Sequence, residues 1–431
     1  MSQARATCCT KQAVVECPRS PEILSARSAP LVTLRITRPA LDVQPGPTPR
    51  WRLSVELVVR DGSRPTAETI WLEGPGSPNT VDGSGTPWAV MFAPLAAQLG
   101  QPLVVEAPVA VPVAEGIRTV SEQWSRWYDG VVPVRLEAPQ TEASVSRSDR
   151  AATFFTGGVD SLWSALDQRE TGASERDLIC IHGFDLQLDE EDAFKRMTEK
   201  FGRWAVSWGG QVVALRTNLR TTRAEVAPWG PLAHGCALVG AGLALGPRYD
   251  VLRIAATGGR RDPHPWGSHV ETDHLLGTGR TRIDHHGAEA ARWEKVRRIV
   301  EDADALDLLR VCWRSGTDRN CGACSKCLRT MALLEVFNAL ERAPTFPDGL
   351  PLDALAHVHV KESWDVREFS DLIELATERD RPDVVDAART AMLRSRWGGK
   401  AVAFLDRLAG TPGLGIPARA CRTRIHAAWI S

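Results

Sequence analysis

Two different patterns of hydrophobic positions, or rhythms, follow each other along the chain. In the first, apolar and polar residues alternate across 31–37 and 53–59, which is typical of strands that bury one face. Sequences rich in Gly, Pro and Asp separate these strands from apolar runs at 70–72, 88–92 and 103–105, as turns would. The pattern predicts a mostly β N-terminal domain, to which all five segments contribute.

The second rhythm begins near residue 150. Four short apolar runs, rich in residues that favour strands, alternate with three segments of helical period. The runs lie at 152–155, 178–181, 212–215 and 251–254, and the helical segments at 161–169, 189–208 and 231–245. This alternation indicates βαβ units on a parallel sheet, so we expect ligands beyond the carboxyl ends of the strands.

The two rhythms predict an α/β protein of several parts. We expect an irregular tail over 1–25, the mostly β domain over 26–147, a parallel-sheet domain over 148–345 and a small helical domain over 346–431. The last part shows helical spacing of apolar residues between 355 and 408. Docking or dimerisation is a conceivable use of these helices, so a homodimer is one expectation.

Composition narrows the classes of partner. The 431 residues carry 52 Lys and Arg against 53 Asp and Glu, a formal net charge of -1, so no sequence-wide field attracts nucleic acid or an anionic membrane. No apolar run of about 18 residues and no signal-peptide pattern is found. We therefore expect a cytoplasmic protein without membrane or nucleic-acid partners, whose ten cysteines are thiols or metal ligands.

The first strand-to-helix junction reads Thr156-Gly157-Gly158-Val159-Asp160-Ser161. Two glycines allow backbone amides to approach an anion closely, and the helix N-terminus adds its dipole. The hydroxyls of Thr156 and Ser161 can donate to phosphate oxygens, while Asp160 can hold a Mg²⁺ ion that bridges them. The junction is therefore a candidate phosphate site.

Four cysteines form the second candidate site, at Cys312, Cys321, Cys324 and Cys327. Four thiolates suffice for a closed tetrahedral Zn²⁺ site, which would be structural because no coordination position stays open. A [4Fe–4S] cluster is the alternative, although the continuation typical of ferredoxins is absent. Ligand type alone does not separate the two.

A third segment, 258–298, holds five of the ten histidines. It is interpreted either as a substrate-binding loop over the phosphate site or as a solvated polar connection. Arg260 and Arg261 lie near its start. They are the candidate catalytic arginines, because a guanidinium pairs bidentately with phosphate or carboxylate.

The string Thr156–Ser161 resembles the Ser-Gly-Gly-x-Asp-Ser loop of the adenine-nucleotide α-hydrolase-like superfamily, the PP-loop or N-type ATP pyrophosphatases, with Thr in place of the first Ser. Together with the cysteine spacing, it is similar to the 7-cyano-7-deazaguanine synthase family over about residues 150–345. The chain lacks that family's Tyr-Gly-Gln-Arg-His motif and carries long flanking regions.

The resemblance implies an enzyme that binds ATP and Mg²⁺ and forms AMP and pyrophosphate. A substrate oxygen would be adenylated, then displaced by ammonia, an amine or sulfur. The substrate would be a small molecule, a carboxylate or amide-like heterocycle. The implied nucleotide-binding residues are Thr156, Gly157, Gly158, Val159, Asp160 and Ser161 on the first loop, His182 and Phe184 on the adenine side, and Thr257 and Gly258 on a second loop.

Two other functions remain open at this point. A sulfurtransferase of the same superfamily, acting on tRNA or a small molecule, would need a persulfide-bearing cysteine, for which Cys180 and Cys236 are available. A non-catalytic nucleotide-binding scaffold is the other alternative. Intact glycines and Asp160 argue against it.

Overall fold

The computed structural model describes residues 33–44, 49–61, 64–142, 148–170, 176–257, 264–314 and 316–409. The strands are β1 (Leu34–Ile36), β2 (Ala40–Gln44), β3 (Arg50–Asp61), β4 (Arg64–Pro75), β5 (Leu103–Val105), β6 (Val109–Ala110), β7 (Leu136–Glu137), β8 (Gln140–Thr141), β9 (Ala151–Phe154), β10 (Arg176–His182), β11 (Val212–Thr217), β12 (Val251–Ala255) and β13 (Arg282–His286). The helices are α1 (Thr86–Leu99), α2 (Val111–Trp127), α3 (Val159–Glu170), α4 (Glu191–Val206), α5 (His234–Leu243), α6 (Arg292–Val300), α7 (Ala303–Leu308), α8 (Ser325–Val336), α9 (Leu352–Ala356), α10 (Ser363–Glu378) and α11 (Pro382–Ala409).

Most strands belong to one mixed sheet, in the order β13-β12-β9-β10-β11-β4-β3-β1-β5-β7, with β2 paired to β3. Strands β13 to β11 run parallel, which confirms the predicted parallel sheet. The antiparallel hairpin β3–β4 then joins this parallel part through β11. An α/β fold with a C-terminal helical region is therefore confirmed.

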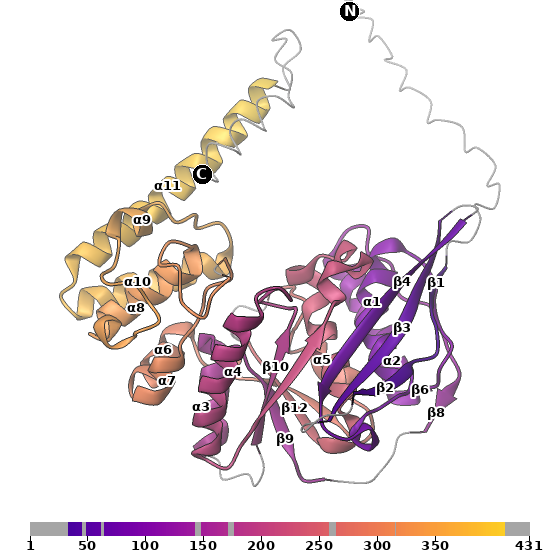
Figure 1. Cartoon of the computed structure of the whole chain (residues 1–431). Coiled ribbons are helices and arrows are strands. Elements are labelled where there is room, and N and C mark those ends of the chain that lie inside the picture. The colour runs from indigo at the N-terminus through magenta and orange to yellow at the C-terminus, as the bar shows by residue number, and fades with distance from the viewer. Residues whose placement is uncertain are drawn as a thin grey trace, which may run out of the picture. The chain divides into compact units, whose positions relative to one another are not determined.

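Helices cover both faces of the parallel strands (Figure 1). On β10, Leu178 and Cys180 pack into the hydrophobic cluster that includes residues of α3, α4 and α6. Ile179, between them, packs into the opposite cluster with α1, α2 and α5. We call these the α3 face and the α5 face. Their alternation along β10 explains why the run Leu178–Ile181 is apolar at every position, as central parallel strands usually are.

The run 88–92, which counted toward the β domain, is helical and lies inside α1. Residues from Thr86 to Ala97 are all buried there, so the helix is apolar on every side and its sequence carries no amphipathic period to distinguish it from a strand. Pro87 in the first turn fits the start of a helix.

The sheet continues across the predicted boundary near residue 147. Besides the β4–β11 pairing, the Thr217 hydroxyl donates to the carbonyl of Trp71 at 2.7 Å, and Asn218 donates to the carbonyl of Thr69 at 2.9 Å. The predicted β domain and parallel-sheet domain thus share one sheet. The division of the chain into domains stays a prediction.

The histidine-rich window has more structure than a loop. Its C-terminal part forms β13, parallel to β12, followed by α6, which packs beside α3. The C-terminal region is helical in α9, α10 and α11, as predicted. Among the described residues, no helix is both long and apolar enough to cross a membrane.

Candidate functional site

The junction after β9 forms a compact loop around the Ser161 hydroxyl. Ser161 Oγ accepts from the Thr156 N–H at 3.3 Å and donates to the Gly158 carbonyl at 3.2 Å. The Thr156 hydroxyl lies 3.4 Å from Ser161 Oγ and accepts from the Gly158 N–H at 3.3 Å. Thr156 itself is exposed. The two predicted hydroxyls therefore lie side by side at the start of α3, where the first N–H groups of a helix have no intrahelical partner.

Gly157 fixes the course of this loop. Its φ is +73°, a left-handed conformation that favours glycine, and an added Cβ would lie 2.8 Å from Phe201 Cζ and 2.9 Å from the Leu308 carbonyl oxygen. The Gly157 carbonyl accepts the Arg310 N–H at 2.8 Å. Backbone geometry and packing thus both require glycine here.

The loop lies at the point where the sheet reverses its winding. From β9 the chain proceeds outward to β10 and β11, and then returns to the other side of β9 to form β12 and β13. The connection after β9 leads to the α3 face, whereas β12 is followed by a segment that packs near α5 and α2. In open α/β sheets, ligands bind at such switch points, beyond the carboxyl ends of the strands.

A buried lysine connects the ends of the two central strands. Lys295 of α6 has a 2% exposed side chain, and its ammonium donates to Asp160 Oδ1 at 2.9 Å and to the Ala256 carbonyl at 2.6 Å. Asp160 lies in the first turn of α3, and Ala256 follows β12. Lys295 therefore places a fixed positive charge at the switch point.

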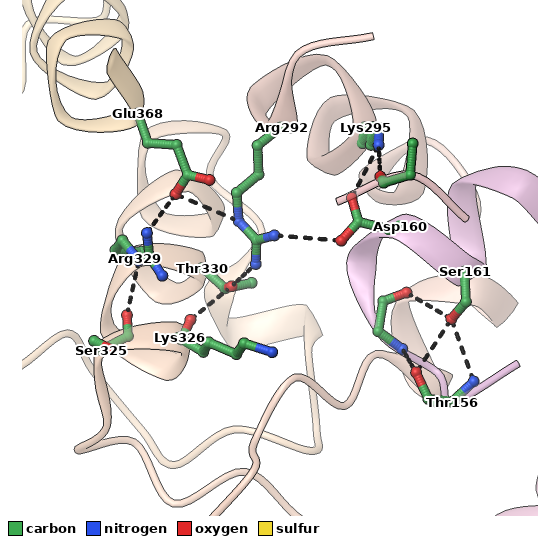
Figure 2. Close-up of polar contacts among 12 residues, drawn as sticks. Thr156, Asp160, Ser161, Arg292, Lys295, Ser325, Lys326, Arg329, Thr330 and Glu368 are labelled. Atoms are coloured by element: carbon green, nitrogen blue, oxygen red, sulfur yellow. Dashed lines mark hydrogen bonds and ion pairs between the residues drawn. The ribbon is translucent and has the colours of Figure 1, made fainter. Parts of the chain in front are cut away.

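A second cation approaches Asp160 from the same helix. Arg292 Nη1 lies 3.8 Å from Asp160 Oδ2, and another nitrogen of the guanidinium donates to Thr330 Oγ1 at 3.1 Å. Glu368 of α10 lies 3.9 Å from Arg292 Nε and accepts from Arg329 at 2.8 Å. Figure 2 shows the Arg292 guanidinium between Glu368 and Asp160, so the helical region and the loop meet through this arginine.

Half-buried rings continue from these charges toward α5. We call Trp229, His234, Trp266, His264 and Trp364 the aromatic row. Neighbouring ring centroids are 5.7 to 6.4 Å apart, and Trp364 also lies under the Arg329 guanidinium at 5.3 Å. The row therefore connects α10 with the start of α5, and it offers faces on which a flat ligand can stack.

The four predicted metal ligands meet in one cluster. The sulfur atoms of Cys312, Cys321, Cys324 and Cys327 all lie within 4.8 Å of one another, close to the spacing of about 3.8 Å that Zn–S bonds of about 2.3 Å impose in a tetrahedron. Cys321 Sγ accepts the N–H groups of Ala323 and Cys324. The cluster can hold a metal ion such as zinc.

Within the cluster, the Cys324 thiol has the lowered pKa, whereas its hydrogen bond raises the pKa of the Cys327 thiol and burial raises that of Cys321. A hydrogen bond from the Cys327 thiol lowers the pKa of the Cys324 thiol below its ordinary value, and metal binding requires deprotonated thiols. Three of the four cysteines are buried. These features fit a closed structural site.

The remaining predicted nucleotide residues have other roles in the structure. Val159 is a core residue, 1% exposed. The His182 ring is buried, stacks on Phe194 and uses Nε2 to bond the Gln187 carbonyl at 2.7 Å; burial lowers its pKa. Phe184 is buried and its ring contacts that of Trp229. Only backbone groups of these residues therefore remain candidates for adenine.

The second loop is described in part. Thr257 is exposed beyond the end of β12, next to the carbonyl that Lys295 binds. Gly258, Arg260 and Arg261 lie outside the described residues, so their role as nucleotide-binding and catalytic residues stays a prediction. The described cations at the loop are instead those of α6.

The sequence analysis missed Lys295 and Arg292 as site residues. Both were visible only as charges on a helix within the histidine-rich window. Their spacing of three residues places them on one face of a helix, which was a signal that they act together. Nothing in the sequence indicated that this face turns toward Asp160.

No family model, no curated protein and no solved structure matches this chain. Its function must therefore be inferred from the site itself.

Proposed function

We propose that the protein is an AMP-forming, ATP-dependent enzyme of the PP-loop type, similar in chemistry to 7-cyano-7-deazaguanine synthase. One observation carries this proposal: the Thr156–Ser161 loop lies at the switch point of the sheet, with buried Lys295 beside it. Hydroxyls, a helix N-terminus and cations converge there, and each of them favours bound phosphate.

The β,γ-phosphates of ATP would bind the hydroxyls of Thr156 and Ser161 and the backbone of Gly157 and Gly158. A resident Mg²⁺ ion at Asp160 does not fit, because Lys295 already donates to this carboxylate at 2.9 Å and Arg292 faces its other oxygen. Mg²⁺ prefers several oxygen ligands and keeps its waters. The metal would therefore arrive with the phosphates of the nucleotide.

The proposed reaction has two steps. A substrate carboxylate or amide-like oxygen attacks the α-phosphorus and pyrophosphate leaves; ammonia, an amine or sulfur then attacks the adenylated carbon, and AMP departs. Lys295 and Arg292 would offset the negative charge that develops at the loop. The aromatic row supports a planar heterocycle as substrate, since its rings offer stacking surfaces.

Sulfur transfer is less well supported than amide or nitrile formation. Cys180 and Cys236 are 2% and 1% exposed, and burial raises the pKa of both thiols above the ordinary value. A persulfide carrier needs an accessible thiolate. Neither residue meets this requirement.

The test is release of AMP and pyrophosphate from MgATP by the purified protein. A pool of carboxylate metabolites that includes 7-carboxy-7-deazaguanine would be added with ammonium chloride, and omitted in parallel. We expect pool-dependent AMP that falls at least 100-fold in Asp160→Asn. Ser161→Ala serves as a second variant, because its side chain makes no ion pair.

Asp167→Asn is the matched control, since Asp167 lies on the same helix but pairs with His286 at 3.1 Å. It should retain AMP formation. ATP binding without AMP release from any pool would contradict the ligase and favour the scaffold, whereas AMP release that requires sulfide would identify a sulfurtransferase.

A further inference from the structure

A buried carboxylate and a histidine pair on the α5 face of the sheet, at the end of β13. Asp273 is 1% exposed. Its Oδ2 accepts from the Ser268 hydroxyl at 2.6 Å and lies 2.8 Å from His285 Nδ1, while Oδ1 accepts the His269 N–H at 3.1 Å. These donors compensate the burial of a negative charge.

The carboxylate determines how the His285 ring is used. Because ionised Asp273 only accepts, the Nδ1 next to it carries the proton, and the neutral ring then presents its lone pair at Nε2. A carboxylate that orients a histidine in this way is the usual support of a general base.

The arrangement differs from a serine nucleophile triad. Ser268 Oγ donates to the same Asp273 oxygen as His285 and lies 3.4 Å from Nδ1, the ring nitrogen that faces the carboxylate. A triad serine would bond the other ring nitrogen. Ser268 therefore helps to hold Asp273, and the chemistry is left to His285.

The pair stands at the carboxyl edge of the parallel strands, where ligands of open α/β sheets bind. In the parallel pairing of β12 with β13, Ile254 is opposite His285, and the Ala256 N–H donates to the His286 carbonyl at 2.8 Å. The carbonyl of the same Ala256 binds Lys295. Ala256 is thus bonded both to β13, which carries His285, and to Lys295, which binds Asp160.

We propose that His285 is the general base for the second half of the reaction, with Asp273 and Ser268 as positioning residues. This role rests on the proposed function. As the amine nitrogen forms its bond to the adenylated carbon, it gives one proton to His285 Nε2. The carbon–oxygen bond to AMP breaks, and its electron pair leaves with the AMP oxygen.

The experiment separates the two half-reactions in the full-length protein. Pyrophosphate exchange into ATP, with the carboxylate pool present, reports adenylation; ammonium-dependent AMP release reports transfer. His285→Asn keeps a donor toward Asp273 but has no Nε2 base. We expect exchange within threefold of the wild type and AMP release lowered about 100-fold or more.

The pH dependence gives a readout that a purely structural residue would not change. Among the ionisable groups, Asp273 bonds the ring directly and His269 interacts with it, while His234 at the start of α5 interacts with Asp273. Plotted against free ammonia, the pH profile of AMP release should differ in shape between the wild type and His285→Asn. His274→Asn, an exposed histidine bonded only within its own turn, is the matched control.

The outcomes decide between the two proposals. Wild-type exchange with unchanged transfer in His285→Asn would overturn the general base and leave the ligase intact. An equal fall of both half-reactions in that variant would assign His285 a structural role. Failure of the wild type to support exchange with any pool member would overturn the proposed function, and with it this role.

Discussion

The Lys295 ammonium lies 2.9 Å from Asp160 Oδ1 and 2.6 Å from the Ala256 carbonyl oxygen. A single buried side chain of α6 therefore ties the loop after β9 to the end of β12. The Asp160 side chain is 19% exposed, so solvent reaches the carboxylate of the pair but not the ammonium. Such pairs are costly to break, because the remaining charge stays desolvated.

Lys295→Met should lower the free energy of unfolding by about 2 to 4 kcal/mol, since it leaves Asp160 without its nearest cation. Adding Asp160→Asn to this variant should recover at least about 1 kcal/mol, because the uncompensated carboxylate is then removed. Urea unfolding monitored by tryptophan fluorescence measures the free energy of unfolding of the wild type, of the two single variants and of the double variant.

Arg118→Met provides the control, because Arg118 pairs with Glu122 on the surface of α2 at 2.7 Å, with 63% of its side chain exposed. Its loss should change stability by less than about 1 kcal/mol. Additive effects of the Lys295 and Asp160 substitutions would show that the two charges are not coupled.

The two loop glycines should respond differently to alanine. In Gly157→Ala the new Cβ would contact Phe201 and the Leu308 carbonyl, and the residue would keep a φ of +73°. We therefore expect the free energy of unfolding to fall by about 2 to 3 kcal/mol and nucleotide binding to be lost. In Gly158→Ala the new Cβ lies 3.2 Å from the Thr156 hydroxyl, and the next atoms, at 3.9 and 4.0 Å, are at ordinary van der Waals distance. This variant should fold, and its free energy of unfolding should fall by less than about 1 kcal/mol.

Unfolding free energies and ATP affinity by calorimetry separate the two glycine variants. If Gly157→Ala were as stable as Gly158→Ala, the left-handed turn described for this loop would be wrong.

The cysteine cluster should carry one zinc ion per chain. Elemental analysis of the purified protein should show a 1:1 ratio, and Cys327→Ser should lose the metal because Cys327 is the fully buried member of the cluster, 0% exposed. Cys236→Ser, which changes a buried cysteine outside the cluster, should keep it. Iron with stoichiometric sulfide would instead identify the cluster alternative.

The metal should also order the phosphate loop. Asn320 accepts the N–H groups of Val311 and Cys312 through its side chain, and the Arg310 N–H holds the Gly157 carbonyl at 2.8 Å. Removal of the metal should therefore speed amide hydrogen exchange in residues 154–162 at least tenfold, while exchange in β3 stays unchanged. Equal protection with and without the metal would contradict this coupling.

Sequence reasoning succeeded where short-range geometry determines the structure. The cysteine spacing brings the four sulfur atoms together by short-range geometry, as predicted. The hydroxyls of Thr156 and Ser161 also lie side by side, while phosphate binding at this junction stays a prediction. Among the four parallel strands, β10 is apolar over Leu178–Ile181 because it is buried on two faces, whereas β11 and β12 alternate buried with half-buried residues.

Features set by long-range packing were not accessible in this way. Helix α1 shows no amphipathic period because all its sides are buried. Strand β13 has the sequence Arg-Ile-Asp-His-His, which is too polar to resemble a buried strand. The partners of Asp160 come from a helix 135 residues further along the chain. Only the topology of the sheet brings Lys295 there.

Acid should destabilise the protein before its carboxylates titrate. Burial lowers the pKa of His182, His234 and His269 below the ordinary value, which is about 6.5. The unfolded chain therefore takes up these protons first as the pH falls. Their contribution to stability is complete above about pH 6.5 and declines below it, by at most about 1.4 kcal/mol per pH unit for each histidine.

Urea unfolding at pH 7.5 and pH 5.5, with metal content verified at each pH, tests this expectation. The free energy of unfolding should be about 2 to 4 kcal/mol lower at pH 5.5. His234→Asn, which keeps a donor for the carbonyls of Trp229 and Gly230 that His234 binds, should reduce the difference. Exposed His274→Asn should leave it unchanged, and equal stability at both pH values would show that the three rings are not buried in the neutral form.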